Sequence, residues 1–188
     1  MLRLDTTLVR GDFSLRAGCA FGEGVHLIRG RIGSGKSTLA SALAGLEPAE
    51  GIEWTGGRRV LLMQMPEYHL TESSLEKEAA SWGVTGSEEA FGLFPHYAEM
   101  KARDPFTLSR GELKRFLLAC MLSCGADLLV LDEPYASLDA DAKEMLTLLL
   151  RKRSGTVIVF SHEPAALPHT DWKITGGELK CLTSASGF

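Results

Sequence analysis

A nine-residue stretch near the start of the chain constrains its fold more than any other feature. Residues 30–38 read Gly-Arg-Ile-Gly-Ser-Gly-Lys-Ser-Thr and match the phosphate-binding pattern G-x-x-x-x-G-K-[ST] at every position. Its glycines allow backbone conformations that residues with a Cβ avoid, so successive N–H groups can turn toward one anion. The sequence therefore predicts a P-loop formed by Gly30, Arg31, Ile32, Gly33, Ser34, Gly35, Lys36, Ser37 and Thr38.

The residues around this loop have the strand–loop–helix order that a P-loop requires. Residues 25–28 read Val-His-Leu-Ile and predict a short buried strand. After the loop, a helix is predicted over 38–44 and is followed by Gly45, a residue typical of helix ends. The positive end of this helix dipole favours bound phosphate. We expect Lys36 to neutralise the β/γ-phosphate charge and Ser37 to offer its hydroxyl to Mg²⁺.

Length, charge and cysteine content limit the class of protein. The 188 residues predict one domain over 1–188, and a net charge of −4 gives no reason to expect nucleic acid as a partner. The chain shows neither a leader segment nor an apolar run near the ~20 residues that span a bilayer, so a cytoplasmic protein is expected. Without a secretory signal, the four cysteines are expected to be small buried hydrophobes rather than disulfides or zinc ligands.

Alternating apolar residues and glycine turns predict paired antiparallel strands. The predicted pairs are 2–8 with 13–21, 52–55 with 59–63, and 171–174 with 178–182. The first pair predicts an antiparallel layer at the start of the chain. In the second pair the connection is Gly56-Gly57, which is typical of a hairpin.

The composition changes between residues 67 and 106. Glu, Ala, Ser and aromatic residues with scattered Gly and Pro predict short helices such as 75–82 and 87–94, so we expect a helical subdomain inserted in the core. Its predicted aromatic core consists of Trp82, Phe91, Phe94, Tyr97 and Phe106. A further helix follows Ser109, which forms the capping-box pattern S-x-x-E with Glu112. That pattern alone predicts only a well-capped helix.

Polar residues follow two continuous apolar runs later in the chain. Residues 128–131 and 156–160 predict buried parallel strands, and they end in Asp132-Glu133 and Ser161-His162. Open α/β sheets bind ligands at this edge, where an aspartate of a P-loop protein is the usual partner of Mg²⁺. A solvated acidic turn and a structural histidine are the alternatives. The shared edge favours a functional site.

Taken in order, these residues resemble the nucleotide-binding subunit of ATP-binding-cassette (ABC) proteins over nearly the whole chain. The similar motifs are 30–38 (Walker A), Gln64 (Q-loop), 108–112 (signature), 128–133 (Walker B), 137–139 (D-loop) and His162 (switch histidine). Residues 64–70 are similar to the Gln-x-Pro-Glu-x-x-Leu segment of energy-coupling-factor and cobalt-type importer ATPases. The resemblance implies an α/β P-loop NTPase: a mostly parallel core sheet with helices, an N-terminal antiparallel β-layer and an inserted small helical subdomain at about 67–125.

The resemblance also implies an activity, the hydrolysis of ATP coupled to transport, and the residues that carry it. ATP would be bound by the P-loop, Gln64, Ser109 and Gly111, and Mg²⁺ by Ser37, Gln64 and, through water, Asp132. The implied catalytic residues are Lys36 on the phosphates, Glu133 as general base for the attacking water, and His162 on the γ-phosphate.

The family works as a head-to-tail dimer in which each ATP lies between one chain's P-loop and the other chain's signature. The resemblance therefore implies a second ABC ATPase subunit, identical or different, and a transporter membrane subunit at the inner face of the cell membrane. A soluble ABC ATPase in cofactor assembly or DNA maintenance is the alternative. The segment from Gln64 to Ser109 is too short for the coiled-coil or zinc-bearing insertions of repair-type members.

Two departures from the family pattern bear on rate and selectivity. The signature has Arg110 where glycine is usual and Glu112 where glutamine is usual, which predicts an altered rate. The aromatic residue that often stacks on adenine ahead of the P-loop is missing, because residues 8–10 are Leu-Val-Arg. We therefore expect loose selectivity for the base.

Overall fold

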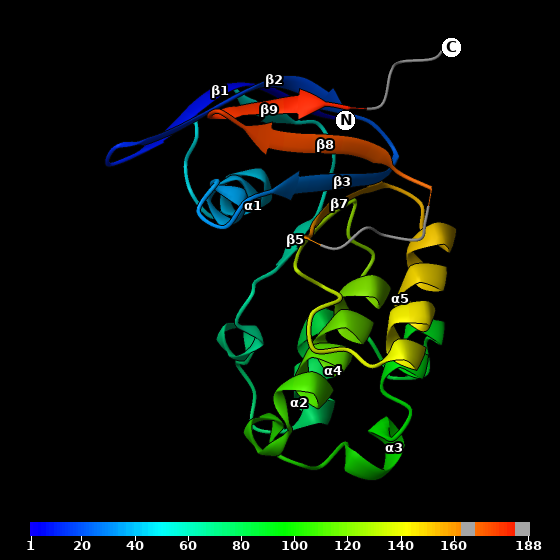
Figure 1. The fold of residues 1–188 in the computed structure, drawn as a ribbon. Helices are drawn as coiled ribbons and strands as arrows, with labels where there is room; N and C mark the ends of the chain where they lie inside the picture. Colours follow the sequence, from blue (N-terminus) through cyan, green and yellow to red (C-terminus); the bar gives the residue numbers. More distant parts are fainter. Residues whose placement is uncertain (163–167, 183–188) are drawn as a thin grey trace.

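The computed structural model describes residues 1–162 and 168–182. Within these residues nine strands form one mixed sheet in the order β4-β1-β2-β9-β8-β3-β7-β6-β5 (Figure 1). The strands are β1 (Leu2–Arg10), β2 (Phe13–Phe21), β3 (Gly24–Gly30), β4 (Ile52–Trp54), β5 (Arg59–Leu62), β6 (Leu128–Asp132), β7 (Thr156–Phe160), β8 (Thr170–Thr175) and β9 (Glu178–Cys181).

The core of the sheet is parallel, as predicted. Strand β7 lies between β3 and β6 and is parallel to both, and β5 and β8 extend this arrangement on either side. Every residue of β6 and β7 is buried, which fits strands that are covered on both faces. The carboxyl ends of β3, β6 and β7 therefore meet at one edge of the sheet.

The antiparallel layer is also confirmed. Strands β1 and β2 pair from Leu2 opposite Phe21 to Arg10 opposite Phe13, and β8 and β9 form the pair predicted for 171–174 and 178–182. Helix α1 (Lys36–Ala44) packs between this layer and the parallel strands, because Leu39 joins a buried cluster with residues of β1, β2 and β6. The helix begins two residues before its predicted start, and Gly45 ends it in the left-handed conformation (φ 77°).

The prediction of a hairpin across Gly56-Gly57 is wrong. Strand β4 pairs with β1 and β5 pairs in parallel with β6, so the two strands lie at opposite ends of the sheet. The Gly56-Gly57 pair marks a change in chain direction, but it does not show that the two flanking strands pair with each other. The continuous burial of residues 60–62 is typical of a parallel strand covered on both faces, whereas β4 is only half-buried.

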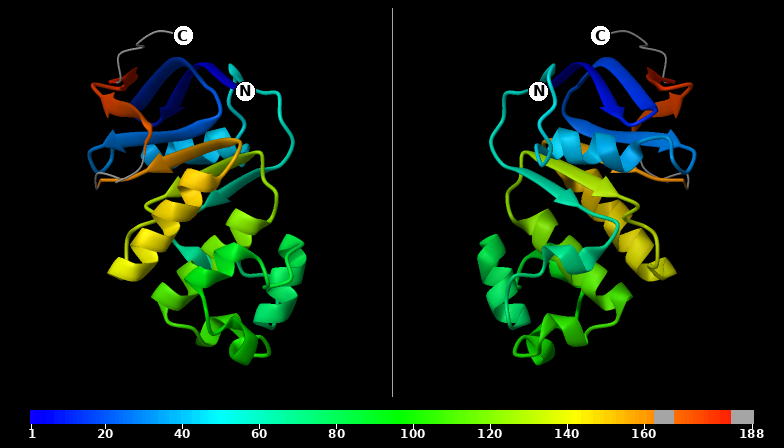
Figure 2. Two further views of the ribbon diagram at one scale, coloured as in Figure 1. Left: turned by 90° about the vertical axis from the view of Figure 1, so that its right-hand side faces the viewer. Right: turned by 90° about the vertical axis from the view of Figure 1, so that its left-hand side faces the viewer.

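Helical elements between residues 66 and 123 gather at the end of the molecule opposite to β1, β2 and β9 (Figures 1 and 2). Beyond α1, the helices are η1 (Pro66–His69), α2 (Leu75–Trp82), η2 (Glu89–Leu93), α3 (Tyr97–Met100), η3 (Pro105–Thr107), α4 (Arg110–Ser123) and α5 (Ala140–Lys152). Helix α2 matches its predicted range, and the predicted helix 87–94 is a shorter 3-10 helix. No helix among the described residues is long and apolar enough to cross a bilayer.

The aromatic core of this helical region contains most of the predicted residues. Phe91 and Tyr97 have ring centroids 4.8 Å apart, and Phe94 lies edge-on to Phe116 of α4. Phe106 is 67% exposed, so its predicted place in the core is wrong. In the three-residue helix η3, the buried position is taken by the preceding proline.

The four cysteines lie in different environments. Cys120 is buried, and burial raises the pKa of its thiol; Cys19 and Cys124 are half-buried. Cys181 is exposed at the end of β9, so the expectation that all four are buried is wrong for this residue.

Two histidines whose pKa values are lowered, the buried His26 and the half-buried His69, should make the stability of this fold depend on pH. The Nε2 atom of His26 lies 3.1 Å from the carbonyl oxygen of Gly22, and its Nδ1 accepts a hydrogen bond from Trp172 Nε1 (3.3 Å). His69 Nε2 accepts from the backbone N–H of Met63 (3.0 Å). Burial is the main cause that lowers the pKa of both rings.

We predict that the midpoint temperature of thermal unfolding decreases when the pH is lowered from 7.5 to 5.5. Below the ordinary histidine pKa of about 6.5, the unfolded chain binds protons that the folded chain does not, so the free energy of unfolding decreases. Over this pH range, the midpoint temperature of the His26→Gln variant should decrease less than that of the wild type. The control is His96→Gln, since His96 is exposed. Equal pH dependence in His26→Gln and the wild type would contradict this account.

Candidate functional site

A cleft of about 830 Å³ lies at the edge where β3, β6 and β7 end. The predicted site residues that line it are Ile32, Gly33, Gly35, Lys36, Ser37, Thr38, Gln64, Asp132, Glu133 and His162. Gly30, Arg31 and Ser34 line an adjoining hollow behind the loop. The structure thus brings together polar residues as far apart in the sequence as Lys36 and His162, which are 126 positions apart, because parallel pairing sets the ends of their strands side by side.

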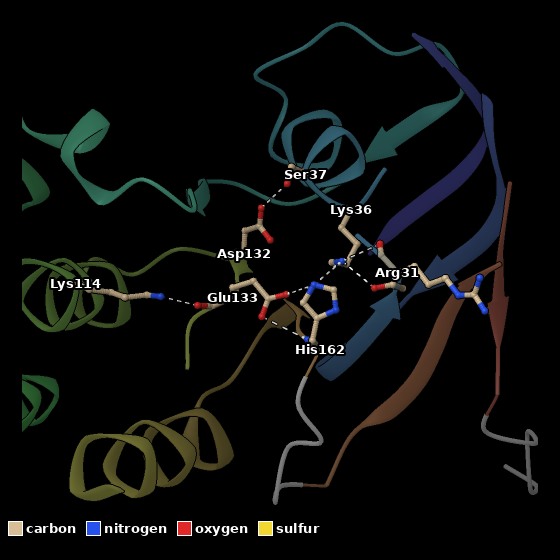
Figure 3. Close-up of polar contacts among 8 residues, drawn as sticks. Arg31, Lys36, Ser37, Lys114, Asp132, Glu133 and His162 are labelled. Atoms are coloured by element: carbon tan, nitrogen blue, oxygen red, sulfur yellow. Dashed lines mark hydrogen bonds and ion pairs between the residues drawn. The ribbon is translucent and has the colours of Figure 1, made fainter. Parts of the chain in front are cut away.

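Helix α1 begins inside the loop, at a position that only glycine can occupy. Gly35 caps the helix with φ 90°, and a Cβ on Gly35 would lie 2.2 Å from the ring of Phe13. Lys36 is the first helical residue and is 8% exposed. Its Nζ donates hydrogen bonds to the carbonyl oxygens of Gly30 (2.9 Å) and Arg31 (3.3 Å), so the side chain folds back over the loop (Figure 3). Burial lowers the pKa of Lys36, and the carboxylates of Glu133 and Asp132 oppose that shift.

Ser37 and Asp132 contact each other through their side-chain oxygens beside Lys36. Ser37 Oγ donates to Asp132 Oδ2 at 2.7 Å, and Asp132 is buried at the end of β6 (Figure 3). Gln64, which follows β5, lines the same cleft. A hydroxyl, a carboxylate and an amide oxygen are hard donors of the kind Mg²⁺ prefers, so the residues present fit this ion.

Glu133 and His162 hold each other at the mouth of the cleft. His162 Nε2 lies 3.2 Å from Glu133 Oε1, and the His162 backbone N–H donates to Glu133 Oε2 (3.4 Å). The same Nε2 atom lies 3.1 Å from Lys36 Nζ. One ring nitrogen cannot both donate to the carboxylate and accept from the ammonium, so the tautomer and charge of His162 decide which contact is made. Glu133 itself has a left-handed backbone (φ 50°).

Of the signature residues, Arg110 lines this cleft, whereas Ser109 and Gly111 do not. Ser109 caps α4 through the full capping box: its backbone N–H and Oγ donate to Glu112 Oε2 (2.8 and 2.6 Å), and the Glu112 N–H donates to Ser109 Oγ (3.3 Å). These bonds from Ser109 lower the pKa of Glu112. The predicted cap is therefore confirmed. Neither Ser109 nor Gly111 lines the cleft of its own chain.

Seven residues that line the cleft were not assigned to it from the sequence. They are Arg10, Phe13, Pro66, Arg110, Lys114, Ala136 and Ser137. Phe13 supplies an aromatic face at the P-loop even though positions 8–10 have none, and its place directly after the Gly11-Asp12 turn is the signal that could have found it. Lys114 lies in a helix whose pattern of apolar residues does not predict a buried lysine. Its place in the cleft depends on contacts with residues distant in the sequence.

Comparisons with known proteins agree with this geometry. Two relatives are energy-coupling factor transporter ATP-binding proteins EcfA2. The one from Bacillus thuringiensis (strain Al Hakam) is 33% identical, over 74% of this chain and 58% of the relative. The one from Clostridioides difficile (strain 630) is 32% identical, over 71% of this chain and 57% of the relative. The chain thus spans less than two thirds of the length of these curated relatives.

Solved structures share the fold at lower identity. A putative cobalt transport ATP-binding protein has a TM-score of 0.77 at 22% identity, over 95% of this chain and 78% of that one. A dimeric ATP-binding cassette in a post-hydrolysis state, bound to ADP and Pi, has a TM-score of 0.78 at 18% identity, over the full length of both chains. The family model for ABC transporter matches residues 19–136, a span from β2 past the Asp132-Glu133 pair. The chain therefore belongs to the ABC transporter family.

Proposed function

We propose that this chain is the ATP-hydrolysing nucleotide-binding subunit of a membrane transporter, an importer of the energy-coupling-factor or cobalt type. The observation that carries the proposal is the single cleft in which the P-loop lysine, the Ser37–Asp132 pair and the Glu133–His162 pair converge. Membership in the ABC transporter family supports it, as do the names of the relatives. Residues 1–188 form one ATPase domain, with a helical subdomain at about 67–125.

The P-loop binds the phosphates of ATP in this proposal. Its backbone N–H groups and the start of α1 supply fixed positive potential, and Lys36 moves from the loop carbonyls to the β- and γ-phosphates. Ser37 and Gln64 would hold Mg²⁺, with Asp132 acting through water. The ion would supply positive charge to the phosphate oxygens.

Glu133 is the general base. The contacts with His162 hold its carboxylate in the cleft, where it can orient and polarise the attacking water. His162 would contact the γ-phosphate through its ring, whose Nε2 lies 3.1 Å from Lys36 Nζ and 3.2 Å from Glu133 Oε1.

The catalytic site is completed by a second ABC ATPase subunit, either a copy of this chain or a different one. Ser109 and Gly111 stand at the N-terminus of α4 and do not reach the chain's own cleft. A helix N-terminus with free N–H groups binds anions, and in a head-to-tail dimer it faces the γ-phosphate held by the other subunit.

The other proposed partner is a membrane subunit, which places the chain on the inner face of the cell membrane. The segment after Gln64 carries exposed apolar side chains, with Met65 44% and Tyr68 69% exposed and with Glu67 between them. This segment joins the proposed Mg²⁺ ligand to the helical region, so it can report the nucleotide state to a docked helix of the membrane subunit.

The Glu133→Gln variant should lower turnover by roughly 10²–10⁴-fold, the usual contribution of a general base, while ATP affinity is kept. The measurements are phosphate release and equilibrium binding of ATP. ATP should also trap the variant as a dimer in size-exclusion chromatography. The control is Glu144→Gln on the exposed side of α5, which should hydrolyse like the wild type. Hydrolysis near the wild-type rate by Glu133→Gln would remove Glu133 from the mechanism.

Mixing two inactive variants tests the shared site. Dimers of Lys36→Ala with Ser109→Arg contain one intact site, whereas each variant alone contains none. We expect differently tagged mixed dimers, isolated by sequential affinity steps, to hydrolyse ATP faster than either variant. Background activity in isolated mixed dimers would show that the signature does not act across the subunit boundary.

Charge changes in the exposed segment test the membrane partner. We expect Glu67→Lys and Tyr68→Asp to abolish co-purification with a membrane subunit from native membranes, with ATP binding retained. Glu99→Lys, an exposed charge reversal on α3, is the control. The wild type should be a weak ATPase alone and be stimulated by the membrane subunit in lipid. Stimulation by DNA, without a membrane partner in the pull-down, would instead favour the soluble ABC ATPase.

A further inference from the structure

Lys114 of α4 is a buried cation that the mechanism above does not use. It is 5% exposed, and among the described lysines only Lys36 is also buried. Its Nζ donates to the carbonyl oxygen of Glu133 (2.5 Å) and to that of Ala136 (2.9 Å). An ammonium group is costly to bury unless acceptors replace its water, so these two carbonyls hold the side chain in place.

The two carbonyls belong to a strained segment that carries the general base. Glu133 and Ser137 both have left-handed backbones, with φ 50° and φ 66°, although neither is glycine. Such conformations persist only where surrounding contacts hold them. The Glu133 carbonyl receives Lys114 Nζ and also the Ala136 N–H (3.2 Å), while the Glu133 N–H donates to Phe160 O (2.9 Å). Lys114 thus fixes the peptide plane that directs the Glu133 carboxylate.

Helix α4 touches this segment at two further points on the same face. A Cβ on Gly111 would lie 3.3 Å from the Ser137 carbonyl oxygen, so the helix start packs closely on the backbone there. One residue after Lys114, Arg115 Nη1 pairs with Asp139 Oδ2 (3.2 Å). The first two turns of α4 therefore form one unit with residues 133–139, and the same helix presents Ser109 at its N-terminus.

We propose that Lys114 is a positioning residue that joins the signature end of α4 to the backbone of Glu133 and so orients the general base. This inference rests on the proposed ATPase function. Displacing the start of α4, as engagement of Ser109 by a second subunit's nucleotide would do, shifts the donor that holds Glu133. The consequence is that each chain's hydrolysis responds to the state of the site to which its own signature contributes.

The electrostatic setting agrees with this role. Burial lowers the pKa of Lys114 to about 8, Glu133 and Asp132 raise it, and Arg110 on the same helix lowers it. The neighbouring carboxylates keep a buried ammonium tolerable at neutral pH.

The test is a double-mutant cycle between Lys114 and Glu133, read by single-turnover hydrolysis of radiolabelled MgATP with the full chain. Lys114→Met removes the donors at similar volume and should lower the rate by about 10–100-fold through misplacement of the base, with the ATP dissociation constant unchanged. In the Glu133→Gln background, the same substitution should change the residual rate by less than about twofold, because Lys114 acts only through Glu133. The control is Lys77→Met, because Lys77 is an exposed residue of α2.

Lys114→Gln provides a second variant that keeps N–H donors on a shorter side chain. Its hydrolysis rate should lie between those of the wild type and Lys114→Met. If circular dichroism shows that Lys114→Met does not fold, Lys114→Gln replaces it in the double-mutant cycle. Equal fold-losses with and without Glu133 would overturn the proposal, since a general structural defect affects both backgrounds. A Lys114→Met rate equal to wild type would overturn it as well. Failure of the proposed function would appear separately, as wild-type protein that does not hydrolyse ATP.

Discussion

The parallel pairing of β7 with β3 on one side and β6 on the other determines where the polar groups of the cleft lie. In this register Phe160 stands opposite both Ile28 and Asp132, so the P-loop, the acidic pair and His162 leave the sheet at one edge. Strands β6 and β7 are buried along their length, and β3 is buried at residues 26–28. Moving β7 by one residue would turn each of its buried side chains to the other face of the sheet, so the packing on both faces fixes the register.

Features with local causes could be predicted from the sequence. The P-loop needs only nine consecutive residues, and Gly35 is required there by a positive φ and by the closeness of Phe13. The capping box of Ser109 and Glu112 spans four residues. The hairpin of β1 and β2 follows from a turn between two alternating strands. In each case the interacting groups are close in sequence.

Features that depend on distant partners could not be predicted in the same way. Strands β4 and β5 flank a glycine pair but join opposite ends of the sheet, because the apolar content of β5 suits the parallel core. A lysine inside an amphipathic helix predicts a solvated charge, yet Lys114 is buried against the carbonyls of Glu133 and Ala136. Its burial is set by the fold of residues 133–137, whose left-handed positions no sequence pattern marks.

Under the proposed function, binding and chemistry are divided between two subunits. The P-loop, the proposed metal ligands and the proposed general base line the cleft of one chain, whereas the signature residues Ser109 and Gly111 do not. Lys114 and Arg115 connect that signature to the base within the same chain. Communication between two sites in a dimer then needs no long pathway, since one helix reaches both.

A structure of the Glu133→Gln protein with ATP and Mg²⁺ tests this account most directly. The account predicts ATP in the cleft, its β- and γ-phosphates on Lys36, Mg²⁺ beside Ser37 and Gln64, and Ser109 of a second subunit at the γ-phosphate. Nucleotide bound elsewhere, or held in a cleft that no second subunit closes, would contradict it.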